Sequence, residues 1–205
     1  MKNFIKSLLG KNKNQNENKK ADDDYKYLPK KDELIEEKFT KNFSENGGKF
    51  LYASDIQECN DFFNKILDEN DWNKKNILCF DEKILNDFLN PVKVITNKSN
   101  LNSNLLITNC EFLVAKDGSI LVSTHQIKSY KIKDIPRNII VLAKTSQLSE
   151  TVSKGLEGIR IKYSNNLPSN ITSIKNFNCA ENEKLNFLTY GTSSKNLYLI
   201  LLEDL

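Results

Sequence analysis

The amino-acid sequence predicts an α/β fold in which helices cover a mixed β-sheet. In the first half, apolar stripes at helical spacing alternate with short apolar runs, which is typical of parallel strands joined by crossover helices. In the second half, three apolar runs lie only a few residues apart between residues 105 and 123, a spacing that favours strands turning back on one another. The run LYLILL at 197–202 is too apolar for an edge strand, so we expect it at the centre of the sheet.

Residues 33–96 are expected to alternate between helix and strand. The first helix ends at Gly47-Gly48, where glycine permits the left-handed backbone of a helix stop. Ser54 and Gln57 predict a capping box for the second helix, and Asp81 is the expected N-cap of a short third helix. The predicted strands of this half are 49–54, 76–80 and 92–96.

Residues 105–202 are expected to be richer in strands. Asp117-Gly118 is a strong hairpin-turn signal, and a continuous buried strand follows Pro136. Ser146 is the expected N-cap of the next helix, whose apolar stripe starts at Leu148. The predicted strands of this half are 105–108, 111–115, 119–123, 138–143, 171–175 and 197–202.

The charge distribution divides the chain into a tail, 1–32, and a single domain, 33–205. The tail carries nine lysines and five acidic residues, whereas the remainder carries 21 basic and 22 acidic residues, so the net charge of +3 comes from the tail. The polar run 11–24 is typical of disorder, and residues 1–10 place apolar side chains at helical spacing between lysines. Two interpretations stay open: a disordered tail with an apolar end, or a weak amphipathic anchor for an anionic membrane or a partner.

Composition excludes several classes of protein. The domain is near neutral and holds only Arg137 and Arg160, which argues against nucleic-acid binding. No apolar stretch approaches the roughly 18 residues of a transmembrane helix. The four cysteines are far apart and the chain has one histidine, so we expect no zinc site and reduced thiols in a cytoplasmic protein. No motif in the sequence specifies a cofactor.

Three loops have the residue types that bind small anions. In open α/β sheets, ligands bind beyond the carboxyl ends of strands, where loops expose backbone amides and small polar side chains. Three predicted loops of this chain contain glycines or small polar side chains of this kind. The candidate ligand-binding residues are Lys116, Asp117, Gly118 and Ser119 in the first loop, Ser169 and Asn170 in the second, and Thr192, Ser193 and Lys195 in the third.

The spacing of chemically active residues does not define a catalytic constellation. His125 lies near Ser123, but a nucleophile needs a base and an orienting group that converge in space. Cys110 has no neighbouring base in the sequence. Glu111 is a lone carboxylate within an apolar run, and two interpretations stay open: it faces solvent, or it lines a ligand pocket. We therefore include Glu111 among the candidate ligand-binding residues.

The order of four segments resembles the LUD domain, the lactate-utilisation family of LutC/YkgG-like proteins. That family has an Ala-Glu-Thr-Gly-Thr turn, a Pro before His-Ile-Val, a Gly-Pro-Ser-Arg-Thr-Ala-Asp-Ile segment and a terminal His-Gly-Pro. The segments that carry the resemblance are ITNCEFLVAKDGSILVS (107–123), IPRNIIVLAKTSQL (135–148), LPSNITSIK (167–175) and GTSSKNLYLILLEDL (191–205). The matching positions are Ala115, Gly118, Ser119, Pro136, Ile140, Val141, Pro168, Ser169 and Ile174.

The resemblance implies a fold shared with ribose-5-phosphate isomerase, glucosamine-6-phosphate deaminase and the CoA transferases. It also implies a role beside iron–sulfur partner proteins in the oxidation of lactate to pyruvate. Three motifs differ: Lys116-Asp117 replaces Glu-Thr, Asn170 replaces Arg, and Ser194-Lys195-Asn196 replaces His-Gly-Pro. Because asparagine lacks the charge of an arginine clamp, either the ligand differs or Lys116 or Lys195 supplies the charge.

We therefore expect a LUD-domain protein that binds a small anionic ligand and has no recognisable catalytic residue. The alternatives are a non-catalytic interaction module and an enzyme of the wider superfamily, of the CoA transferase or formyltetrahydrofolate cyclo-ligase type. A CoA transferase needs a glutamate nucleophile, for which Glu111 is the candidate. The discriminating observation is geometric: Asp117, Gly118, Ser169, Asn170 and Thr192 should face one cleft, and the hypothesis of ligand binding between the three loops fails if they lie on unrelated surfaces.

Overall fold

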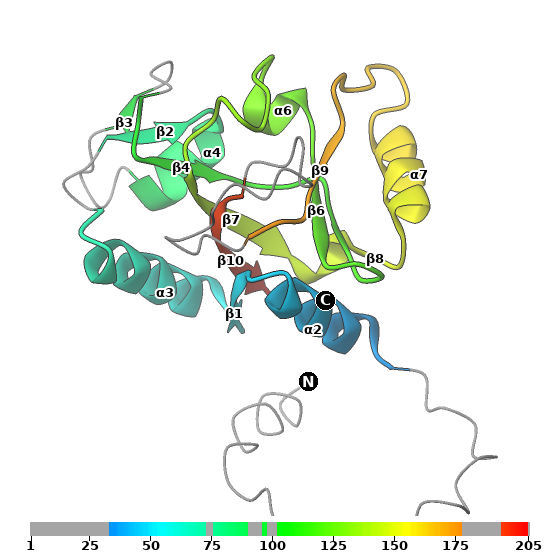
Figure 1. Ribbon diagram of the computed structural model, residues 1–205, viewed down its shortest axis with the longest axis horizontal. Helices are drawn as coiled ribbons and strands as arrows, with labels where there is room; N and C mark the ends of the chain where they lie inside the picture. Colours follow the sequence, from blue (N-terminus) through cyan, green and yellow to red (C-terminus); the bar gives the residue numbers. More distant parts are fainter. Residues whose placement is uncertain (1–32, 73–75, 90–95, 98–101, 178–193, 205) are drawn as a thin grey trace, which may run out of the picture. The chain divides into compact units, whose positions relative to one another are not determined.

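The structure is a computed structural model that describes residues 33–72, 76–89, 96–97, 102–177 and 194–204 (Figure 1). Within these ranges the strands form two sheets, one of six strands and one of four. This arrangement confirms the predicted α/β class, with the strands divided between a parallel sheet and a mixed sheet. None of the helices in the described ranges combines the length and apolarity that crossing a membrane requires.

The larger sheet is parallel throughout, and β10 is one of its interior strands. Its strand order is β1 (Lys49–Ala53), β10 (Asn196–Leu202), β7 (Asn138–Lys144), β4 (Leu105–Thr108), β2 (Ile77–Cys79) and β3 (Thr96–Asn97). β10 pairs with β1 on one side and β7 on the other, which confirms the central position predicted from its apolar run. Of the strand predicted at 92–96, residues 92–95 lie outside the described residues.

The smaller sheet holds the predicted hairpin. Its order is β8 (Leu148–Ser149), β5 (Phe112–Val114), β6 (Ser119–Val122) and β9 (Thr172–Ile174), with β6 antiparallel to both β5 and β9. The expectation that all three runs between 105 and 123 turn back on one another is wrong for the first of them. β4 instead joins the parallel sheet between β2 and β7, because its four buried residues need cover on both faces.

Four of the described α-helices begin at polar caps, whereas α2 (Ile35–Glu45) begins after Leu34, and two of the predicted caps differ from those in the structure. α3 (Ile56–Glu69) is capped by Asp55, whose carboxylate accepts from the backbone N–H of Glu58 at 2.8 Å, rather than by Ser54 and Gln57. After β7, Ser146 lies in the short 3₁₀ helix η2 (Thr145–Gln147), and α7 (Val152–Lys162) begins only after its N-cap Thr151. The remaining helices are α4 (Glu82–Ile84), which continues as the π-helix η1 (Leu85–Leu89), and α6 (Thr124–Ile127).

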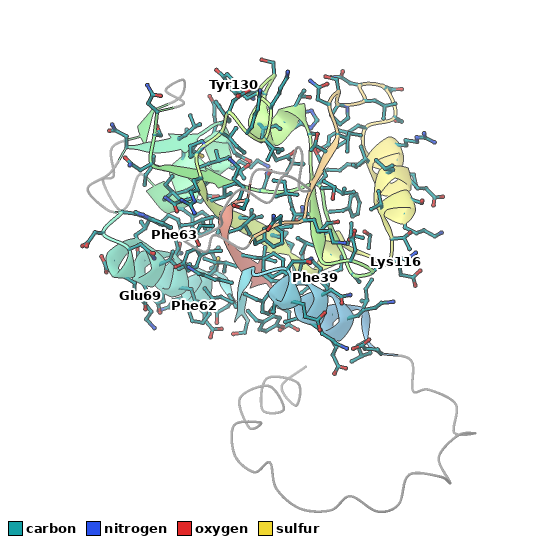
Figure 2. All side chains as sticks on the ribbon, viewed as in Figure 1. Phe39, Phe62, Phe63, Glu69, Lys116 and Tyr130 are labelled. Carbon is teal, nitrogen blue, oxygen red and sulfur yellow. The ribbon has the colours of Figure 1, made fainter. Side chains whose placement is uncertain are left out.

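The apolar core lies on both faces of the parallel sheet. Alternate residues of β4 point to opposite faces, so that Leu105 and Ile107 pack with α3 while Leu106 packs with α2 and the smaller sheet. Phe63 of α3 and Phe39 of α2, both labelled in Figure 2, belong to these two separate clusters. The outer face of the smaller sheet packs against α7. The smaller sheet is therefore covered by apolar side chains on both faces.

The turn of the β5–β6 hairpin docks on α2. The side-chain amides of Asn42 and Asn46 donate to the backbone oxygens of Ala115 and Asp117, each at 2.7 Å. Gly118 has φ +68°, and a Cβ at this position would overlap the backbone of Asn42 and its neighbour. Both the left-handed backbone and the close approach of α2 therefore require glycine.

We expect Gly118→Ala to lower the free energy of unfolding by about 2–4 kcal/mol, from left-handed strain together with overpacking against α2. Urea denaturation of the full chain measures this change. Lys41→Ala, an exposed position on α2, is the matched control and should change stability by less than about 0.5 kcal/mol. Equal stability of Gly118→Ala and the wild type would contradict the steric argument.

Candidate functional site

The candidate site lies at the carboxyl edge of the parallel sheet. Because the strands are parallel, the segments after β2, β4, β7 and β10 all leave this edge. From β2 the chain moves outward to β3, whereas from β4 it moves the opposite way to β7, so β2 and β4 flank the point where the topology switches. Crevices at such points are the usual ligand sites of open α/β sheets.

A cavity of about 410 Å³ opens beside this edge, a volume typical of small-molecule sites. It is bounded by the segments that follow β4 and β7 and by the last turn of α7. Its lining combines an apolar floor with amide, hydroxyl, carboxylate and ammonium groups. The lining residues are Asn109, Cys110, Glu111, Phe112, Leu142, Lys144, Ser146, Gln147 and Lys162.

Glu111 is the polar centre of the site. It follows β4 and is 1% exposed, yet each of its carboxylate oxygens has two polar partners. Oε1 accepts from Ser123 Oγ at 2.7 Å and lies 3.2 Å from His125 Nδ1. Oε2 accepts from Tyr163 OH at 3.0 Å and from Lys162 Nζ at 3.3 Å. Of the two interpretations of Glu111, the structure therefore supports the one in which it lines a pocket.

The four partners keep the buried Glu111 ionised. Burial acts to raise its pKa, but the hydrogen bond from Ser123, the charge of Lys162 and the hydrogen bonds from His125 and Tyr163 together lower the pKa below its usual value. The pKa of Lys162 is raised: burial lowers it, but the contacts with Tyr163 and Glu111 outweigh that effect. Lys162 is thus a cation fixed at the wall of the cavity.

A chain of side-chain hydrogen bonds connects Glu111 to the switch point of the sheet. Gln126 Oε1 accepts from the backbone N–H of Ser123 at 2.8 Å, which forms the capping box of α6. Its Nε2 donates to Asn109 Oδ1 at 2.8 Å, and Asn109 Nδ2 donates to Asp81 Oδ2 at 2.7 Å. These polar contacts therefore fix the loops after β2 and β4 in position relative to α6.

Lys144 and Ser146 line another part of the cavity, and Asp204 contacts both of them. Lys144 Nζ lies 3.6 Å from Asp204 Oδ2, so the ends of β7 and β10 are tied together. Asp204 also accepts from Ser146 N at 2.9 Å and from Ser146 Oγ at 2.8 Å. Burial acts to raise the pKa of Asp204, but these hydrogen bonds and the Lys144 charge lower it.

The first predicted loop lies away from this cavity. Its residues form the hairpin turn on α2, at the opposite end of β5 from Glu111. Ser119 is buried and donates to Asp117 Oδ1 at 2.7 Å, and Asp117 forms a 3.8 Å ion pair with Lys175. Lys116 is exposed and lies on the side of the smaller sheet away from α6 (Figure 2).

The second loop lies beside α6. Ser169 and Asn170 are exposed, and the backbone oxygen of Ser169 accepts from the N–H of Thr124 at 3.2 Å. This loop is at the opposite end of β6 from Gly118, so the expectation that the two loops face one cleft is wrong. The antiparallel β6 separates them by its full length. Any ligand contact by either loop stays a prediction.

The third loop is only partly described. Thr192 and Ser193 lie outside the described residues. Lys195 is 2% exposed, and its Nζ donates to the backbone oxygen of Ile135 at 2.8 Å. The positive charge at the cavity comes instead from Lys144 and Lys162. Neither lysine was predicted from the sequence as a ligand-binding residue.

The positions of two residues of this site, Asn109 and Lys144, could have been predicted from the sequence. Asn109 directly follows a predicted strand, and Lys144 directly follows another, the positions that reach the carboxyl edge. Lys162 and Tyr163 end a surface helix and have no such signal. Burial raises the pKa of the Cys110 thiol, which keeps it protonated and unsuited to nucleophilic attack. Within the described ranges, no cluster of three or more His, Cys, Asp or Glu side chains is arranged to hold a metal ion.

The described residues form an α/β domain with a polar cavity at the carboxyl edge of its parallel sheet, and comparison with known proteins identifies the family. The LUD domain profile matches residues 36–202, and the chain belongs to the LUD domain family. The crystal structure of a DUF162 family protein from Deinococcus radiodurans superposes with a TM-score of 0.58 at 13% identity, covering 83% of this chain and 96% of that one. This similarity shows a shared fold. No curated protein matches the chain.

We expect Glu111→Gln to lower the free energy of unfolding at pH 7 by about 1–3 kcal/mol, because the partners of Glu111 lose a charged acceptor. The depressed pKa of Glu111 contributes stability that is present above the unfolded-state pKa, near 4.3, and is lost as pH falls through the folded-state pKa.

Urea denaturation at a series of pH values from 7 to 3 checks this expectation. The gap between wild type and Glu111→Gln should be constant near neutrality and narrow below about pH 4. Glu157→Gln, an exposed substitution on α7, is the control. A gap that stays the same at every pH would show that Glu111 does not stabilise the fold through its charge.

Proposed function

We propose that this LUD-domain protein binds a small anion in the cavity between the ends of β4 and β7. The observation that carries the proposal is the pair of ammonium groups, Lys144 and Lys162, on the wall of one cavity of about 410 Å³. Their side chains are 59% and 50% exposed, so both ammonium groups remain accessible to a ligand. A carboxylate or a phosphate is the chemical group that such a pair attracts.

The acidic partners of the two lysines hold them in place for this role. Asp204 positions Lys144 and Glu111 positions Lys162, and each ammonium has three donors, so its acidic partner does not exhaust its hydrogen bonding. Ser146 Oγ and the Asn109 amide add neutral polar groups at the same cavity.

Within the family, the role that best fits this site is that of a LutC-type lactate-utilisation subunit. Lactate and pyruvate are small carboxylates that suit two lysines and a cavity of this volume. We propose, on the family resemblance, that such a role also involves iron–sulfur partner proteins. The apolar residues Phe112 and Leu142 beside the lysines favour a ligand with a small apolar part next to its charge.

The CoA transferase alternative is less favoured by the geometry of Glu111. A carboxylate nucleophile needs an accessible oxygen, whereas both oxygens of Glu111 are already contacted by two partners each. Its depressed pKa also marks a weak nucleophile. Glu111 is better suited to positioning the cation and the imidazole around it. An interaction module remains the alternative if no small anion binds.

A ligand screen by thermal unfolding tests the proposal. At about 100 times its dissociation constant, a bound anion should stabilise the protein by roughly 2.7 kcal/mol, a rise in Tm of about 5–10 °C. The panel is lactate, pyruvate, sugar phosphates, CoA esters and folates. Lys144→Met and Lys162→Met should each abolish the shift, while the exposed control Lys154→Met should retain it. Absence of a shift with every compound would contradict anion binding and favour the interaction module.

A further inference from the structure

We propose that His125 is the proton acceptor of this site and that its substrate is a small anion with an acidic C–H next to a carbonyl group. The proposal rests on the anion binding proposed above and adds a reaction to it. His125 is the only histidine of the chain and lies on α6, in contact with the buried carboxylate that also holds Lys162.

The contact with Glu111 determines which ring nitrogen carries the proton. An ionised carboxylate only accepts hydrogen bonds, so the 3.2 Å contact from Glu111 Oε1 requires a proton on Nδ1. In the neutral imidazole, the lone pair is then on Nε2. Among the described residues no hydrogen bond to Nε2 is formed, and the His125 side chain is 41% exposed. The ring is therefore partly open to solvent, and Nε2 is its unprotonated nitrogen.

The surroundings of His125 hold its ring in place. The ring packs on Tyr163 with their centroids 4.7 Å apart, and α6 is held by the capping box of Ser123 and Gln126. A proton gained at Nε2 produces an imidazolium whose Nδ1–H already donates to a buried anion. A carboxylate that orients an imidazole and stabilises its cation is a recurring arrangement in proton-transfer catalysis.

His125 is not itself one of the residues that line the cavity, and Glu111 connects it to Lys162, which is. Oε1 of Glu111 contacts His125 and Oε2 contacts Lys162, whose ammonium lines the cavity. In the proposed step, the C–H bond of the substrate breaks and its proton passes to Nε2. The electron pair forms the C=C bond of an enolate, and the negative oxygen is stabilised by Lys162. The proton on Nε2 then exchanges with solvent, and a solvent-derived proton passes from Nε2 back to carbon, which regenerates the neutral imidazole and needs no oxidant or other co-reactant.

The test follows hydrogen exchange at carbon in D₂O by proton NMR. The probes are pyruvate and dihydroxyacetone phosphate, which separate carboxylate from phosphate recognition. The wild-type full chain should accelerate loss of the C–H signal of at least one probe. His125→Asn should reduce the protein-catalysed rate about 10²-fold or more while leaving the thermal shift by that probe intact. Lys154→Met is the control and should exchange at the wild-type rate.

Added imidazole distinguishes proton transfer from a merely structural role. The His125→Ala variant should regain exchange when imidazole is supplied, because the small base occupies the space left by the side chain. Binding of a probe without exchange by the wild type would overturn this inference and leave the proposed function standing. Absence of binding by every compound of the thermal-unfolding panel would instead overturn the proposed function, and the inference with it.

Nitrogen NMR of untagged protein gives a readout that is independent of turnover. Because the chain has one histidine, its ring resonances are unambiguous. We expect the neutral ring to be protonated on Nδ1 in the wild type and to lose this preference in Glu111→Gln. Protonation on Nε2 in the wild type would overturn the inference.

Discussion

The buried carboxylate of Glu111 is the interaction on which the arrangement of this site depends. It joins the segment after β4 to α6 through Ser123 and to α7 through Lys162 and Tyr163. Burying a charge is costly unless it is paired and hydrogen-bonded, and here four donors offset that cost. The same four contacts orient the groups around the carboxylate. Stability and the geometry of the site therefore have one physical origin.

The two sheets determine where this carboxylate can lie. β4 belongs to the parallel sheet and β5 to the mixed sheet, so the residues between them pass from one sheet to the other. Glu111 is at this junction, covered on the outer side by α7 and adjacent to the carboxyl edge of the parallel sheet. The apolar layers shield its oxygens from water, which strengthens each hydrogen bond made to them.

Membership of the LUD domain family establishes the fold, whereas the site must be understood from its own residues. The match with the solved structure has 13% identity, a level at which folds are retained while side chains differ. The departures at Lys116-Asp117 and Asn170 lie in the hairpin turn and in the loop beside α6, outside the cavity lining. The cavity acquires its positive charge from Lys144 and Lys162, so a change in the family's motif does not imply loss of the site.

Local patterns predicted most of the elements, with small errors where several caps compete. The Asp117-Gly118 turn, the buried strands and the central position of β10 follow from backbone preferences and hydrophobic periodicity. Asp55 replaced Ser54 as the cap of α3 because a neighbouring side chain can satisfy the same N–H. The assignment of β4 to the parallel sheet was missed, since a short apolar run fits either sheet until its neighbours are known.

The sequence by itself determined the α/β class, most of the order of strands and helices and the family resemblance, because these depend on composition and on spacing between nearby residues. The short elements α6 and β8 were not predicted. Only the tertiary structure decided the site. Glu111 meets Lys162 across 51 residues and His125 across 14, and Lys144 reaches the same cavity from another strand. Such convergence depends on strand order and on the separation of the two sheets, which are cooperative properties of the packed core rather than of any local segment.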